Sequence, residues 1–192
     1  MNYLRDRVTA VVGFGRCGSS LTMKMLHTGG VPVYADNFVT YESVLSGQPQ
    51  NRLCLIDCLG KAVKLVQPRF ALPPPDYFYN FIWLERDFNE QAKSLFKFLR
   101  LMLGVDTSGF SVEKNAACFR QQTPRLIATL AAYPSARLIV LRFEEILERP
   151  EQTAEQFRAF LSCDFDVDRA SSVVVRRPTF CLPTVAELTW RC

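Results

Sequence analysis

The sequence is poor in histidine and has no long apolar segment, and these shortages exclude several classes of protein. Its 192 residues include one histidine, His27, and no apolar run comes near the eighteen residues that a membrane-spanning helix needs. The amino terminus, MNYLRDR, is charged and lacks the hydrophobic core of a signal peptide. We therefore expect a cytoplasmic protein with no membrane partner. The sequence also shows no internal repeat and no low-complexity tract.

The cysteines do not form the pattern of a disulfide framework or of a zinc site. Seven cysteines occur, at positions 17, 54, 58, 118, 163, 181 and 192, an odd number scattered through apolar segments. Cys54 and Cys58 lie four residues apart, but no second pair and no suitably spaced histidine completes a metal site. We therefore expect reduced thiols and no bound metal.

Composition and charge are those of an ordinary globular chain. With 48% hydrophobic and 22% charged residues, the sequence resembles neither a disordered nor a membrane-embedded protein. The net charge of +4, from 23 basic and 19 acidic residues, is too small to indicate a nucleic-acid partner. It is enough to allow a basic pocket for a small anion. The length predicts a single domain spanning residues 1–192.

Short apolar runs alternate with helical patterns along the chain. The predicted strands are residues 8–12, 61–66, 80–85 and 137–142, and the predicted helices are 19–28, a long helix after Arg86, 113–132 and 150–161. Asp87 and Glu90 suit a capping pair for the long helix, whereas Pro124 predicts a kink or break. The alternation predicts a three-layer α/β fold with a central parallel sheet and ligands at the carboxyl ends of its strands.

The segment VVGFGRCGSS, residues 11–20, is compatible with two kinds of anion-binding turn. Gly13, Gly15 and Gly18 fit the dinucleotide pattern, and Asp36 follows at the distance of a ribose-binding acid. Gly13 and Gly18 also frame a phosphate loop, although Ser19 stands where the lysine of an ATP or GTP hydrolase belongs. A turn that only packs a helix on a strand is the third alternative. An ATP-dependent kinase would also need a magnesium-binding strand, which residues 53–57, LCLID, resemble.

Five segments resemble the sulfotransferase family, in order along the chain. GFGRCGSSL at 13–21 resembles the loop that binds the 5'-phosphosulfate, and Arg86 with Ser94 is similar to the site for the 3'-phosphate. Residues 137–161 are similar to the late strand, turn and proline-initiated helix of these proteins, and residues 27–36 and 60–66 resemble a bacterial branch. The resemblance implies the sulfotransferase variant of the phosphate-loop fold. It extends from about residue 8 to residue 161.

The resemblance also implies an activity. The donor would be 3'-phosphoadenosine 5'-phosphosulfate, the product adenosine 3',5'-bisphosphate (PAP), and the acceptor a hydroxyl or amine of a small molecule or saccharide, with no metal. The implied donor-binding residues are Gly15, Arg16, Cys17, Gly18, Ser19, Ser20, Arg86 and Ser94. A binding module without turnover, a nicotinamide-dinucleotide domain and a kinase remain the alternatives.

Candidate catalytic residues are Arg16, Asp36 and Glu42. Arg16 occupies the place of the family's loop cation, where it would stabilise charge on the leaving oxygen. Asp36 is the first candidate for the general base, because it resembles the acid of tyrosylprotein-type sulfotransferases, and Glu42 is the second. His27 would lie roughly 12 Å from the loop, at the end of its helix.

Four further charged residues belong to the expected surface or to the edges of the site. We expect Lys61 and Lys64 to serve as strand-edge solubilisers or to hold an anion, and Glu144 with Glu145 to form a solvated helix start.

Overall fold

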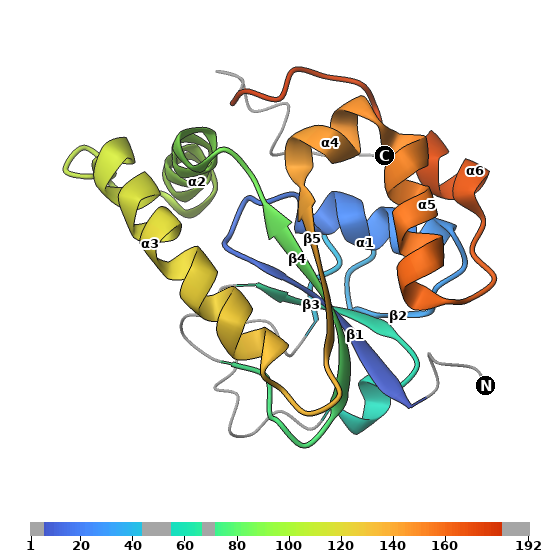
Figure 1. The fold of residues 1–192 in the computed structure, drawn as a ribbon. Coiled ribbons are helices and arrows are strands. Elements are labelled where there is room, and N and C mark those ends of the chain that lie inside the picture. Colours follow the sequence, from blue (N-terminus) through green and yellow to red (C-terminus); the bar gives the residue numbers. More distant parts are fainter. Residues whose placement is uncertain (1–5, 44–54, 67–71, 182–192) are drawn as a thin grey trace.

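A five-stranded parallel sheet lies at the centre of the molecule, with helices on both faces (Figure 1). The computed structural model describes residues 6–43, 55–66 and 72–181 of the chain. The strands are β1 (Arg7–Gly13), β2 (Val33–Tyr34), β3 (Ala62–Val66), β4 (Phe78–Glu85) and β5 (Arg137–Arg142), in the order β2-β3-β1-β4-β5. This architecture confirms the predicted three-layer α/β fold.

The helices divide between the two faces of the sheet. They are α1 (Ser19–Thr28), α2 (Phe88–Leu103), α3 (Val112–Ala131), α4 (Phe143–Glu148), α5 (Pro150–Leu161) and α6 (Val167–Ser172), and a short 3₁₀ turn, η2, covers Ile56–Cys58. Figure 1 shows α2 and α3 on one face and α1, α5 and α6 on the other. Among the described residues no helix is long and apolar enough to cross a membrane.

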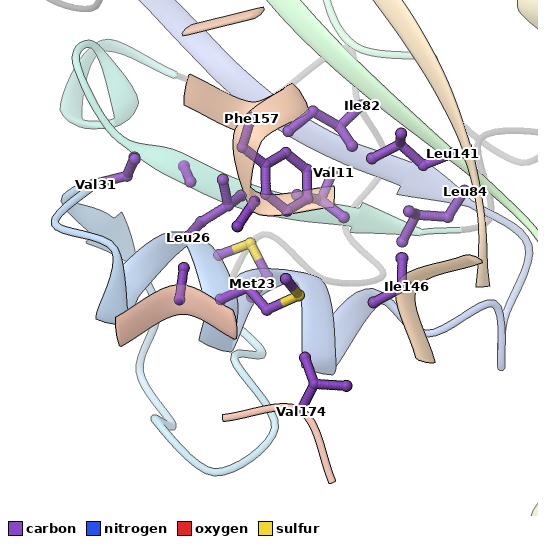
Figure 2. Close-up of a cluster of buried hydrophobic side chains, with 14 of the residues drawn as sticks. Val11, Met23, Leu26, Val31, Ile82, Leu84, Leu141, Ile146, Phe157 and Val174 are labelled. Carbon is purple, nitrogen blue, oxygen red and sulfur yellow. The ribbon is translucent and has the colours of Figure 1, made fainter. Parts of the chain in front are cut away.

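Two hydrophobic cores hold these layers together, one on each face of the sheet. Alternate residues of β1 serve different cores, because successive side chains of a strand point to opposite faces: Val12 joins the core under α2 and α3, and Val11 joins the one under α1 and α5. Figure 2 shows the core under α1 and α5, where Met23 and Leu26 of α1 pack near Phe157 of α5. Each fully buried side chain of this size contributes about 1.5–3 kcal/mol.

The strand order favours the phosphate-loop interpretation of the glycine turn over the dinucleotide interpretation. A dinucleotide-binding sheet places its second strand directly beside the first, which brings the ribose-binding acid next to the turn. In this chain β3 pairs with β1, and β2 pairs with β3 instead. Asp36, just after β2, is therefore one strand further from the turn than the dinucleotide interpretation requires.

One local prediction and part of another are wrong. The proposed magnesium-binding strand at 53–57 is not a strand where the structure describes it: Asp57 lies exposed in η2, and residues 53–54 fall outside the described residues. The N–H of Gly60 donates to the carbonyl of Arg7 over 2.9 Å, which places this segment at the opposite end of β1 from the glycine turn. Pro124 does not break its helix, since α3 continues through it from Val112 to Ala131.

The cysteines that the structure describes agree with the prediction of reduced thiols. The five cysteines that the structure describes, at 17, 58, 118, 163 and 181, form no disulfide with one another, and Cys54 and Cys192 lie outside the described residues.

Candidate functional site

The turn between β1 and α1 has a backbone that few residues other than glycine would tolerate. Gly18 has φ of 100°, and a Cβ atom at this position would collide with the ring of Phe143. A Cβ on Gly13 would lie 2.8 Å from the carbonyl oxygen of Leu84. Arg16 also has a positive φ, 69°, which is unfavourable for a residue with a side chain. The contacts around the turn must therefore hold it in this shape.

The turn presents backbone N–H groups at the start of a helix. α1 begins at Ser19, and its N-cap residue, Gly18, has no side chain to cap the first turn. Within the described part of the chain, the N–H groups of Gly15 and Gly18 donate to no acceptor. Uncapped N–H groups and the positive end of the helix dipole together favour an anion at this position.

Helix α2 packs a polar face against this turn. Besides Ala92, its buried residues are Gln91, Ser94 and Lys97. The apolar residues Phe88, Ala92, Leu95, Leu99 and Met102 recur at helical spacing and predict one buried face of this helix, but the prediction holds only in part, because Met102 is 48% exposed. Gln91 is 1% exposed, and its side-chain amide donates to the carbonyls of Phe14 and Gly15 over 3.1 and 3.0 Å.

The structure brings together the residues of the two predicted phosphate sites. Arg86 directly follows β4, and its Nη1 donates to the carbonyl of Arg16 over 3.3 Å. The Nε of Arg16 in turn donates to the hydroxyl of Ser94 over 3.3 Å. Arg86 is 7% exposed and lies over the ring of Phe143, 4.8 Å from its centroid. Its Nε is buried and has no hydrogen-bond partner among the described residues.

The side chains of Cys17, Ser19 and Ser20 lie in different surroundings. The thiol of Cys17 is fully buried in the core under α1, and burial raises its pKa, against a smaller opposing effect of Lys64. Only the backbone of Cys17 therefore remains for a ligand. Ser19 is buried at the start of α1, whereas Ser20, less buried, donates to the carbonyl of Thr40 over 3.1 Å.

Lys64 is a buried residue of the site, so its prediction as a strand-edge solubiliser is wrong. β3 lies between β1 and β2, and Lys64 is paired in register with Val11, which points to the α1 face. Lys64 is 5% exposed; its Nζ donates to Ser20 Oγ over 3.2 Å and to the carbonyl of Thr40 over 3.1 Å, and forms an ion pair with Glu42. Lys61, by contrast, lies only half-buried, 5.8 Å from the ring centroid of Tyr34.

The two candidate bases occupy the turn that follows β2. The N–H of Asp36 donates to the carbonyl of Glu42 over 2.9 Å, so the two residues face each other across the turn. Asp36 is exposed, whereas the carboxylate of Glu42 is linked to Ser20 through Lys64. His27 lies at the far end of α1, where its Nδ1 is 3.2 Å from the hydroxyl of Tyr41.

The segment after α6 crosses α4 towards α2 (Figure 1). Arg86 Nη2 donates to the carbonyl of Thr179 over 3.1 Å, and the N–H of Cys181 donates to Glu90 over 2.6 Å. Burial acts to raise the pKa of Glu90, but hydrogen bonds from Lys93 and Cys181 lower it below its ordinary value. Arg177 lies over the ring of Phe143, 5.4 Å from its centroid.

The helix-start predictions at 87–90 and 144–145 need correction. Asp87 caps α2 as predicted, but its own N–H donates to Glu144 over 2.9 Å rather than to Glu90. Glu144 is therefore not a solvated helix start, because it holds α4 against the start of α2, whereas Glu145 is exposed.

Gln91 and Thr40 were not predicted as site residues, because both are polar and so stand outside the apolar repeats that mark buried faces. The available signal for Gln91 was its spacing three residues before Ser94, which places both on one face of a helix.

Comparisons with known proteins identify the fold. No protein-family model matches the sequence, and no curated protein matches it. Among solved structures, retinol dehydratase with androsterone and inactive cofactor PAP is similar, with a TM-score of 0.55 and 14% identity over 88% of this chain and 63% of that chain. Retinol dehydratase with retinol and PAP gives 0.55 and 13%, over 88% and 64%.

A mouse protein shows the same likeness. Sulfotransferase SULT7A1 complexed with PAP has a TM-score of 0.54 and 11% identity, covering 89% of this chain and 65% of that chain. This chain thus spans somewhat less than two thirds of the length of each of these proteins. The chain has the α/β fold of the sulfotransferases.

Proposed function

We propose that this chain is a sulfotransferase domain that transfers a sulfuryl group from 3'-phosphoadenosine 5'-phosphosulfate to a hydroxyl or amine of a small-molecule or saccharide acceptor. The observation that carries the proposal is the junction of Arg16, Ser94 and Arg86. A loop cation at the end of β1 and an arginine at the end of β4 contact each other although they lie 70 residues apart. This arrangement suits one ligand with two phosphate groups.

The surroundings of Arg86 fit such a ligand. A buried guanidinium is costly unless an anion or several hydrogen bonds compensate it. Arg86 has two carbonyl acceptors and an aromatic ring, no carboxylate partner among the described residues, and a buried Nε that donates to nothing there. A 3'-phosphate next to Arg86 would supply the missing acceptor.

The glycine turn fits the other end of the donor. When bound, the donor supplies the sulfuryl group. The N–H groups of the turn and the hydroxyls of Ser19 and Ser20 would hold its 5' end, and Cys17 would contribute backbone only. Sulfuryl transfer resembles phosphoryl transfer in spreading charge over equatorial oxygens, so positioning and electrostatics supply most of the catalysis. Arg16 would stabilise the charge on the leaving oxygen.

We assign the general base first to Glu42 and second to Asp36. Glu42 is linked through Lys64 to Ser20, at the start of α1, whereas Asp36 lies in the same turn but is exposed. A base must come within hydrogen-bond reach of the acceptor hydroxyl near the transferred group. The small-molecule class of acceptor is supported by the androsterone and retinol bound to the similar retinol dehydratase structures.

Calorimetric titration with three nucleotides tests the proposal. We expect PAP to bind without metal and more tightly than ATP with magnesium or NAD, because only PAP has a 3'-phosphate for Arg86. Tighter binding of NAD would favour a dinucleotide domain, and a requirement for ATP with magnesium would favour a kinase. PAP binding without turnover on any phenol, alcohol, amine or saccharide tested would indicate a binding module.

A further inference from the structure

The carbonyl groups of the glycine turn are held by side chains of one neighbouring segment. The carbonyls of Phe14 and Gly15 both accept from the amide nitrogen of Gln91, and the carbonyl of Arg16 accepts from Arg86. A primary amide has two N–H groups, so Gln91 can give one to each of its carbonyls. The first half of the turn is therefore fastened to the start of α2 through its oxygen atoms.

Fastening the oxygens fixes where the N–H groups point. In a trans peptide the carbonyl of one residue and the N–H of the next point in opposite directions. Because the Phe14 and Gly15 carbonyls face α2, the N–H groups of Gly15 and Arg16 face away from it. Arg16 has a positive φ of 69°, which the chain does not favour by itself. Gln91 thus stabilises an orientation that the turn would not keep alone.

We propose that Gln91 is a positioning residue for the 5' end of the donor. It acts through the backbone of the turn, since its amide nitrogen donates to two carbonyls and the residue is only 1% exposed. Arg86 and Ser94 lie five residues before and three residues after it, so the arginine and helix α2 that serve the 3' end also shape the 5' end. This inference rests on the proposed function and adds a residue to it.

Three nucleotides and two variants test the assignment. Gln91→Met keeps the length of the side chain and removes both donors, and Gln91→His keeps one donor at a similar reach. We expect Gln91→Met to weaken PAP and adenosine 5'-phosphate equally, by about thirtyfold, as expected for two lost hydrogen bonds. Adenosine 3'-phosphate should change less than about twofold, and Gln91→His should lie between wild type and Gln91→Met.

The controls separate positioning from damage to the fold. Gln156→Met, at an exposed position of α5, should change none of the three affinities. Circular dichroism identifies a variant that fails to fold. If Gln91→Met does not fold, the affinities of Gln91→His for the three nucleotides are compared with those of the wild type instead. Equal weakening of all three nucleotides, or no weakening of adenosine 5'-phosphate, would overturn the role of Gln91 alone. Wild-type protein that binds none of the nucleotides would overturn the proposed function and this role with it.

Discussion

The two sides of the glycine turn differ in how their charge is compensated. On the α2 side, Arg86, Gln91 and Ser94 contact the turn, and Arg86 has neutral carbonyls and a ring as its partners. On the β3 side, Lys64 and Thr40 contact Ser20, and the charge of Lys64 is already balanced by Glu42. Uncompensated positive charge attracts an anionic ligand, whereas a paired lysine and carboxylate contribute little net charge.

Under the proposed function, this difference in charge compensation gives the two sides of the turn different roles. The α2 side is buried and would bind the nucleotide. The β3 side includes the turn with Asp36 and Glu42, where the side chain of Glu42 is 43% exposed and would be accessible to an acceptor. Changes on the α2 side should therefore affect affinity, and changes on the β3 side should affect turnover.

A change at Gly18 should disrupt both sides at once and have the largest effect. In Gly18→Ala, the new methyl group collides with Phe143 at a residue whose φ is 100°, so we expect a loss of about 2–4 kcal/mol in the free energy of unfolding. Urea denaturation measures it. Gly104→Ala is the matched control, because Gly104 also has a positive φ but nothing within 4 Å of an added Cβ, and it should cost about 1 kcal/mol. Equal costs for the two variants would contradict the packing of Phe143 on the turn.

A change at Glu42 should separate turnover from affinity. Glu42→Gln keeps the size of the side chain but removes the proposed base, so we expect turnover to fall by about a hundredfold while PAP affinity changes little. Turnover is followed as PAP released from the donor with a panel of phenols, alcohols, amines and saccharides. Asp36→Asn, in the same turn, should reduce it less than about threefold. The reverse order of the two variants would move the base to Asp36.

A change at Arg86 should produce the opposite result on the α2 side. Under the proposed function, Arg86→Ala removes a charge-assisted contact to the 3'-phosphate, so we expect PAP affinity to fall by about thirtyfold. The affinity for adenosine 5'-phosphate should fall less, through the lost bond to the carbonyl of Arg16. Calorimetry measures both, with Arg125→Ala on the exposed side of α3 as the control. If both nucleotides are weakened equally, Arg86 is not the 3'-phosphate residue.

Local sequence patterns were sufficient to predict those features that depend on residues close together in the sequence. The apolar runs of β1, β3, β4 and β5 and the cap at Asp87 follow from periodicity and from a side chain that reaches its own helix. The glycines at 13 and 18 indicated a tight turn, and the order of strands and helices indicated the α/β layers. The signal for each of these features lies within a short stretch of sequence, even though the strands themselves pair with distant segments.

Contacts between distant segments were decided only by the tertiary structure. The sequence does not reveal that β3 inserts between β1 and β2, because strand order depends on which crossovers bury the most apolar surface. That insertion buries Lys64 beside Ser20 and moves Asp36 away from a dinucleotide-type position. Similarly, Gln91 looks like an ordinary polar helix residue until α2 packs on the turn. A polar side chain acquires its role from the partners that folding brings to it, and these lie far along the chain.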